Sequence, residues 1–496
     1  MRQRRWWRGG GRVAGVVVGL TALSLGKNTA AKVEPPALAT FALVVGVNQS
    51  MDGDAATLRY ADDDAVRFRD LFRTMGAQTY LLTRMDENTR RLYPASASDV
   101  PPRLEALQTT VAEIAAQVAA AGRRGQRTVF YLIYAGHGTA GDSGGYVTLE
   151  DARLGGSDLL ARIIDPVAAT ETHVIVDACN SFFLVLDRGP GGQRRALTGF
   201  AQLGAIAQRR DIGLLLSTSS ARESHEWAAF QAGVFSHEVR SGLYGAADAD
   251  GDGVISYTEM AAFIDRANSA VPNERFRPEV FSRAPDGGGR LLDLRAAPSN
   301  RIEINGTVSG HYYLEDTSGV RLADFNSDAG VRLVRPSPDK LYLRRAGADD
   351  REFVLPPSAT TLRTAALVLQ ESHAAVRGAA NDAFNTLFAL PFGTDVVTAY
   401  SERVDLLTKG APLPGPRATG PGRVRRWAGA FAGVAGLALV SAGVINYLDA
   451  RSLRAGIDGS TSQDVVAATN ERVTSKNRNT ALLLGAGAAA VGAGTL

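Results

Sequence analysis

The feature that most constrains the fold is an alternation of short apolar runs with helix-like patterns across residues 40–270. The apolar runs are rich in branched residues and bounded by turn formers, which is typical of buried strands. Between them, apolar residues recur at three- and four-residue spacing, which indicates amphipathic helices. The pattern predicts an α/β fold with a mainly parallel sheet flanked by helices. Strands are expected at 41–47, 128–134, 173–177 and 213–218, and helices at 62–75 and 102–121.

Two of these strands end in residues that can carry out covalent chemistry. One leads to Gly136-His137-Gly138 and the other to Asp177-Ala178-Cys179. The carboxyl ends of parallel strands meet at one edge of a sheet, where catalytic groups gather. A lone cysteine is more often a small buried residue than a nucleophile, but this position favours a dyad in which His137 takes the proton of Cys179. The backbone amides of Gly138 and Cys179 are then the natural donors to an oxyanion.

Four segments in this order resemble the caspase and metacaspase family, as found in bacteria. They are the two strand ends above, Leu58-Arg-Tyr-Ala-Asp-Asp-Asp-Ala, and Gly233-Val-Phe-Ser-His-Glu-Val-Arg-Ser-Gly-Leu. The resemblance covers about residues 40–270 and implies a caspase-like fold with the activity of a thiol protease (peptidase C14). It implies that Cys179 attacks the peptide carbonyl, while His137 acts as base and then as acid to the leaving amine.

The resemblance also implies a substrate preference. In the metacaspase branch, an Asp two residues before the cysteine and an Asp on the first helix accept an Arg or Lys of the substrate, and Asp177 and Asp64 match these positions. Two carboxylates in one pocket favour a cation and repel an acidic side chain. The alternative role for Asp64 is to complement the dipole at a helix start. Relatives are cut after the cysteine during activation, so Arg194 or Arg195 is a candidate self-cleavage site.

Residues 248–259 match the twelve-residue EF-hand loop at every key position. Gly253 permits the sharp turn of such a loop, and helical patterns lie on both sides of it. We therefore expect a bound Ca²⁺, which either gates the peptidase or braces its last helices. EF-hands commonly pair, so a single loop slightly favours the bracing role. The expected ligands are Asp248, Asp250, Asp252, Val254 through its carbonyl, Ser256 through a water, and Glu259.

The pattern changes beyond the peptidase-like region, which is taken as residues 40–297. Alternating runs between turn residues predict a small β-sandwich at 300–357, followed by a helical segment at 361–409 and a linker rich in Pro and Gly at 410–426. The single Cys excludes an intramolecular disulfide and a thiolate zinc cluster. The net charge is only +3 and no basic block is interleaved with aromatic residues, so nucleic acid is not an expected partner.

Both ends of the chain carry apolar segments. Residues 1–31 have the parts of a signal peptide or a marginal N-terminal anchor. Residues 427–448 are long enough to cross a membrane as a helix, with a buried soluble helix as the alternative, and residues 480–496 are a possible second span. Abundant Ala, Gly and Arg with little Lys indicate a bacterial protein. We expect an exported peptidase domain tethered to the membrane of the cell envelope, in an orientation that the flanking arginines leave open.

Two other functions fit the same sequence. The caspase-like domain could be a catalytically inactive, calcium-binding scaffold at the cell envelope, in which case removal of the Cys179 thiol changes nothing. The chain could also be a structural envelope protein, in which the membrane segments and the β-sandwich carry the role. The peptidase hypothesis instead expects a protein or peptide substrate with a basic residue before the cut bond.

Overall fold

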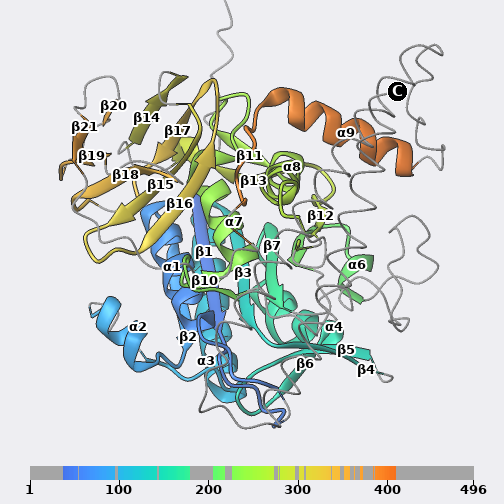
Figure 1. Ribbon diagram of the computed structural model, residues 1–496. Coiled ribbons are helices and arrows are strands. Elements are labelled where there is room, and N and C mark those ends of the chain that lie inside the picture. Colours follow the sequence, from blue (N-terminus) through green and yellow to red (C-terminus); the bar gives the residue numbers. More distant parts are fainter. Residues whose placement is uncertain are drawn as a thin grey trace, which may run out of the picture. The chain divides into compact units, whose positions relative to one another are not determined.

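The computed structural model describes residues 37–408, apart from internal gaps, and is shown in Figure 1. The gaps are 54, 95–98, 142–143, 179–204, 218–225, 273–276, 279, 297–300, 307–308, 337, 347–350, 358–361, 364–368, 372–383 and 385. The expected signal at 1–31, the linker at 410–426 and the expected spans at 427–448 and 480–496 lie outside the described residues. Within the part that is described, no helix is both long and apolar enough to cross a membrane.

A six-stranded mixed sheet has the strand order β12-β8-β7-β3-β1-β2. Five strands run parallel, and β12 runs antiparallel to β8. The four predicted strands are present as β1, β3, β7 and β8, so the mainly parallel sheet is confirmed, whereas β2 and β12 were not expected. The bounds are β1 Leu38–Gly46, β2 Gln78–Thr83, β3 Arg127–Gly136, β7 Glu171–Ala178, β8 Ile212–Ser217 and β12 Val280–Arg283.

Helices cover both faces of this sheet. On one face, Phe72 of α1 lies 4.6 Å from the ring of Tyr131 in β3. On the opposite face, Leu132 belongs to an apolar core that includes α3 and the turns after β6, because successive strand residues point to opposite sides. The bounds are α1 Ala61–Thr74, α2 Glu87–Leu92, α3 Leu104–Arg123, α4 Gly156–Leu159, η1 Leu160–Ile164, α5 Asp165–Val167, α6 Ala205–Gln208, α7 Val234–Ser241, η3 Gly242–Ala246 and α8 Tyr257–Asn268.

Three small antiparallel sheets extend this core. The chain enters the first directly after the end of β3, and the second leads into α7. The third pairs the strand of the predicted calcium loop with β13. The bounds are β4 Gly138–Gly141, β5 Gly144–Thr148 and β6 Arg153–Gly155 in the first, β9 Glu226–Trp227 and β10 Ala232–Gly233 in the second, and β11 Val254–Ser256 and β13 Arg290–Asp293 in the third, which the turn η5 Leu294–Ala296 follows.

Residues 301–371 form two further sheets, with the orders β17-β14-β20 and β16-β15-β18-β19-β21. Strand β16 contacts α7 (Figure 1), and β17 contacts η3. The strands expected at 300–357 are therefore present, while their stacking as a β-sandwich stays a prediction. The bounds are β14 Arg301–Asn305, β15 His311–Asp316, β16 Arg321–Asn326, β17 Gly330–Val334, β18 Leu341–Arg345, β19 Arg351–Leu355, β20 Leu362–Arg363 and β21 Leu369–Glu371.

The expected helical segment at 361–409 needs a correction. Its first part contains β20 and β21, which pair with β14 and β19. These pieces are too short to form helices, and the exposed edges of existing strands supply their hydrogen bonds. Helix α9 begins only at Thr394 and ends at Thr408. From Asp395 onward, this helix belongs to a second compact unit of the chain.

Candidate active site

Strands β3 and β7 lie side by side and end level with each other. In their register, Ala135 pairs with Asp177 and Gly136 pairs with Ala178. The next residues along the two segments are His137 and Cys179. The expected convergence of these strand ends is confirmed. Cys179 itself lies outside the described residues, as do Arg194 and Arg195.

His137 is held by a backbone carbonyl. Its Nε2 lies 3.0 Å from the carbonyl oxygen of Asn48, the second residue after β1. A carbonyl only accepts, so Nε2 carries the proton and Nδ1 has a free lone pair when the ring is neutral. Burial lowers the pKa of His137 from 6.5, although the bond to Asn48 partly opposes this effect. The ring is therefore a neutral base at pH 7, with Nδ1 as its basic atom.

Asn48 was not singled out from the sequence, yet it joins His137 to helix α1. Its Oδ1 accepts from the amide of Ala61 at 2.8 Å, and its Nδ2 donates to Oδ1 of Asp62 at 2.7 Å. The residue before the helix, Tyr60, makes no side-chain capping bond, so Asn48 acts as a remote cap. An Asn just beyond a strand, ahead of an Asp-rich helix start, was the available signal.

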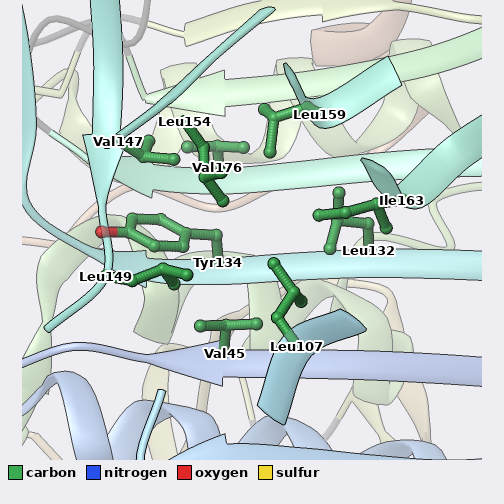
Figure 2. A pocket seen from close by; sticks show the side chains of 10 residues that line it. All are labelled: Val45, Leu107, Leu132, Tyr134, Val147, Leu149, Leu154, Leu159, Ile163 and Val176. Carbon is green, nitrogen blue, oxygen red and sulfur yellow. The ribbon is translucent and has the colours of Figure 1, made fainter. Parts of the chain in front are cut away.

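Tyr134 contacts the backbone of His137. Its hydroxyl lies 2.9 Å from the carbonyl oxygen of His137 and 2.7 Å from that of Thr148. Figure 2 shows its ring among aliphatic side chains, including Val176, around a small cavity in the core. Gly136 leaves room for this arrangement, because a Cβ there would lie 2.7 Å from the hydroxyl. The cavity is lined by apolar side chains of the core, so we do not assign it as the peptide-binding site.

Asp64 and Asp177, which we call the acidic pair, lie close together. A Cβ on Gly233 would lie 2.7 Å from Oδ2 of Asp177 and 3.2 Å from Oδ2 of Asp64. Oδ2 of Asp177 accepts from the amide of Ser236 at 3.0 Å and from its hydroxyl at 2.6 Å. Burial and the charge of Asp64 raise the pKa of Asp177 to about 7, against the opposing hydrogen bonds of Ser236. The structure thus brings together the two carboxylates that the sequence placed 113 residues apart.

Asp64 already has a cationic partner that sequence reasoning missed. Nη1 of Arg240, on α7, lies 2.6 Å from Oδ1 of Asp64. The amide of Gly233 donates to the other oxygen, Oδ2, at 2.8 Å. The only signal for Arg240 was its place in the segment that begins at Gly233, which the family resemblance included.

The predicted calcium loop has the expected turn. Oxygen atoms of Asp248, Asp250 and Asp252 lie within 4.8 Å of one another, so the three side chains can face one ion. Gly253 has a φ of +81°, in the region that favours glycine. Oδ1 of Asp248 is buried and makes no hydrogen bond within the described part of the chain. Burial, and then the neighbouring carboxylates, raise the pKa of Asp248 to about 6.

The other expected ligands flank these three. Oε1 of Glu259 accepts from the amide of Ala249 at 3.2 Å, and Oε2 accepts from the amide of Ser256 at 2.9 Å. Glu259 is therefore not among the three clustered carboxylates, and both of its oxygens bind backbone amides. The hydroxyl of Ser256 caps α8 by accepting from the amide of Glu259. Val254 begins β11, which pairs with β13 where a second EF-hand would otherwise supply the partner strand. A set of oxygen donors of this kind suits a hard cation such as Ca²⁺.

A histidine and a cysteine that follow two adjacent parallel strands are the groups that a cysteine hydrolase with an α/β fold requires. The comparison with protein families is more specific. Residues 39–273 match the family model of the caspase domain. Over this region the chain is similar to the caspase-like cysteine peptidases, and the resemblance inferred from its motifs is confirmed.

The solved structures that match include two caspases. One is caspase-1 from Spodoptera frugiperda, which is 10% identical over 46% of this chain and 77% of that chain, with a TM-score of 0.28. The other is pro-sf-caspase-1, which is 12% identical over 50% of this chain and 87% of that chain, with a TM-score of 0.31. No curated protein sequence matches.

Proposed function

We propose that this protein is a cysteine endopeptidase that uses a dyad of Cys179 and His137. The observation that carries the proposal is the 3.0 Å contact between Nε2 of His137 and the carbonyl of Asn48. This contact leaves Nδ1 as the atom that accepts the thiol proton, at the strand edge from which the chain continues to Cys179. A base held in one tautomer and one orientation is what an activated thiol requires.

The reaction would proceed through an acyl-enzyme. The thiolate of Cys179 bonds to the peptide carbonyl carbon, and the amides of Gly138 and Cys179 stabilise the oxyanion. His137 then gives its Nδ1 proton to the leaving amine as the carbon–nitrogen bond breaks. A water molecule then gives a proton to Nδ1 of His137 and bonds to the thioester carbon. The carbon–sulfur bond breaks, which releases the acid and returns the thiolate of Cys179 beside the protonated His137. The Asn48 carbonyl stabilises the imidazolium each time it forms.

The acidic pair supports a preference for Arg or Lys before the cut bond. Its two carboxylates lie at the end of β7 and on α1, beside the strand that leads to Cys179. Carboxylates attract a cationic side chain and repel an acidic one. The proposed substrate is therefore a protein or peptide with a basic residue at this position.

We further propose that residues 248–259 bind Ca²⁺. The carboxylates of Asp248, Asp250, Asp252 and Glu259, with the carbonyl of Val254 and a water on Ser256, would hold it. Oδ1 of Asp248 is buried and accepts no hydrogen bond from any described residue. Such an oxygen fits a calcium ligand, because burial of a carboxylate oxygen is unfavourable unless a donor, a cation or a proton binds it. Bound calcium supplies positive charge to this loop, which directly follows α7 and η3.

Calcium binding is testable apart from activity. Calcium at a hundredfold excess over its Kd should raise the free energy of unfolding by about 2.7 kcal/mol, seen as a higher Tm than with magnesium. Asp248→Asn should remove this effect. Asp286→Asn is the matched control, since Asp286 is an exposed carboxylate outside the loop whose partner is Arg210. An equal response of both variants would argue against the site.

We also propose that residues 427–448 tether the protein to the membrane of a bacterial cell envelope, with the peptidase domain exported. The support is the length of the apolar run and the signal-like residues 1–31. Fractionation of cells, followed by added protease on intact cells, tests both points. Recovery of the full chain in the soluble fraction would contradict the tether.

The activity test uses the full chain and fluorogenic peptides that end in Arg, Lys or Asp, with and without calcium. We expect turnover of the Arg and Lys peptides, and loss of turnover in Cys179→Ala. Circular dichroism shows whether that variant is folded. A folded, calcium-loaded protein that cleaves none of these peptides would support the inactive scaffold instead.

A further inference from the structure

The two members of the acidic pair differ in what surrounds them. Asp64 is 2% exposed and Arg240 is 1% exposed, so their ion pair is buried. Both oxygens of Asp64 are in use, one by Arg240 and the other by the amide of Gly233. Asp64 is therefore satisfied before any substrate arrives.

Arg240 depends on Asp64 in turn. Its Nε and Nη2 are buried and make no hydrogen bond with the described residues. Its guanidinium lies 5.3 Å from the ring centroid of Phe68 in α1, a contact that holds the cation against that helix. A substrate cation that took Asp64 would leave the Arg240 charge buried without its anion, which is strongly unfavourable.

Asp177 is more exposed than Asp64 and has no ion-pair partner within the described residues. Its side chain is only partly buried. Oδ2 accepts both hydrogen bonds of Ser236, and Oδ1 has no hydrogen bond with any described residue. Of the acidic pair, only Asp177 has a carboxylate oxygen that accepts no hydrogen bond within the described part of the chain.

We propose that Arg240 is a specificity-determining residue, which neutralises Asp64 and leaves Asp177 as the one carboxylate that binds the basic side chain of the substrate. The proposal rests on the peptidase function proposed above and narrows its substrate site from two carboxylates to one. The ion pairs agree with it, since the guanidinium of Arg240 pairs with Asp64, whereas Asp177 has no ion-pair partner within the described residues. Arg240 itself does not touch the substrate and is a positioning residue.

The proposal also concerns the choice between Arg and Lys. A guanidinium binds a carboxylate most strongly through two parallel bonds to both oxygens. Oδ2 of Asp177 already accepts two hydrogen bonds from Ser236, so only Oδ1 is open. A single contact serves an ammonium as well as a guanidinium. We expect kcat/KM for matched Arg and Lys peptides to agree within about threefold.

The test compares peptides that differ only at the residue before the cut bond, which is Arg, Lys or citrulline. Citrulline has the shape of Arg without its charge. Wild-type protein should favour Arg over citrulline by about tenfold to a hundredfold in kcat/KM, as expected for a hydrogen bond to a charged group. Asp177→Asn should reduce this ratio to about one.

The decisive variant is Asp64→Asn/Arg240→Gln, which removes one charge of each sign. Asn at 64 can still accept from the amide of Gly233. The Arg-to-citrulline ratio should stay within about threefold of wild type, whereas collapse of the ratio toward one would show that Asp64 binds the substrate and would overturn the proposal.

If that double variant does not fold, Asp64→Leu/Arg240→Met serves the same purpose, because apolar residues of similar volume often replace a buried ion pair without loss of stability. Failure of the wild-type protein to cleave any of the peptides would refute the peptidase function itself. Cleavage by wild-type protein, with no preference for Arg over citrulline, would refute only the role of the acidic pair.

Discussion

Replacing Asn48 by Ala should separate the stability of helix α1 from the orientation of His137. The substitution removes the bonds that Oδ1 of Asn48 accepts from the amides of Ala61 and Asp62, and the bond that Nδ2 donates to Oδ1 of Asp62. It leaves in place the backbone carbonyl that accepts from His137. Any effect on catalysis must therefore come from movement of this loop, which the side chain otherwise ties to α1.

The size of the effect follows from the loss of the helix cap and of the donor to Asp62. Loss of a helix cap costs about 0.5–2 kcal/mol, and a buried carboxylate that loses a donor costs about 1–3 kcal/mol. Asp62 keeps its bond from the amide of Asp86 at 2.8 Å, which favours the lower half of the second range. We expect a loss of about 2–3 kcal/mol in the free energy of unfolding. A shift of about 1 Å in the Asn48 carbonyl would reduce kcat by up to about a hundredfold.

Urea unfolding and steady-state kinetics on the full chain measure the two effects. Asp151→Ala is the matched control, because Oδ1 of Asp151 caps α3 from another segment by accepting from the amide of Leu104 at 2.9 Å. The control should lose stability with kcat unchanged. If Asn48→Ala behaves like the control, with lower stability but wild-type kcat, then the Asn48 loop does not orient His137 and this part of the reasoning is wrong.

Three further predictions follow from individual contacts. Because burial lowers the pKa of His137 from 6.5, and the base acts when unprotonated, the acid limb of kcat/KM for the citrulline peptide, which does not depend on the charge of Asp177, should lie below pH 6.5. A limb above pH 6.5 with this uncharged substrate would contradict the assignment. The pKa of Asp177 is raised to about 7, and its carboxylate attracts a cation only when ionised. The ratio of kcat/KM for the Arg peptide to kcat/KM for the citrulline peptide should therefore rise as the pH increases through about 7. A ratio that does not change with pH would contradict this role of Asp177. Gly213→Ala should cost about 1–3 kcal/mol or more in urea unfolding, because the new Cβ would lie 2.0 Å from the hydroxyl of Tyr257. Gly288→Ala, in open space, is its control, and equal costs would refute the clash.

The central strands could be predicted because β1, β3, β7 and β8 are continuous apolar runs, as strands covered on both faces require. Strands β2 and β12 could not, because their short sequences carry polar residues and take strand form by pairing with β1 and β8 at the sheet edges. The same reason explains β20 and β21, which were expected as helix. Pairing across the fold, rather than local pattern, decides such segments.

The place of His137 at the end of β3, beside the end of β7, could be predicted because catalytic groups gather where the chain leaves a parallel sheet. The partners of His137 and of Asp64 could not. Asn48 meets His137 across 89 residues of sequence, and Arg240 meets Asp64 across 176. No local pattern encodes such contacts. The sequence therefore predicted a pair of equivalent carboxylates, whereas the structure shows one that is already neutralised.

Helix α7 shows that the proposed substrate site does not depend on the caspase domain alone. On one side, its residues Ser236 and Arg240 hold the two members of the acidic pair. On the other side, Nε2 of His237 donates to the buried carboxylate of Asp324 in β16 at 2.7 Å, and the amide of Asp324 donates to the hydroxyl of Ser241 at 3.0 Å. Burial lowers the pKa of His237 to about 4, so this ring is neutral and needs Asp324 as acceptor.

Removal of β14–β21 would leave the buried Nε2 of His237 without its acceptor, at a cost of about 1–3 kcal/mol, and would expose the face of α7 that β16 covers. The helix that positions both carboxylates would then lack one of its two supports. The match to the caspase family ends at residue 273, but the contacts that fix α7 extend at least to Asp324. The physical unit that holds the proposed substrate site is therefore longer than the family domain, because the acidic pair and the second set of sheets share one helix.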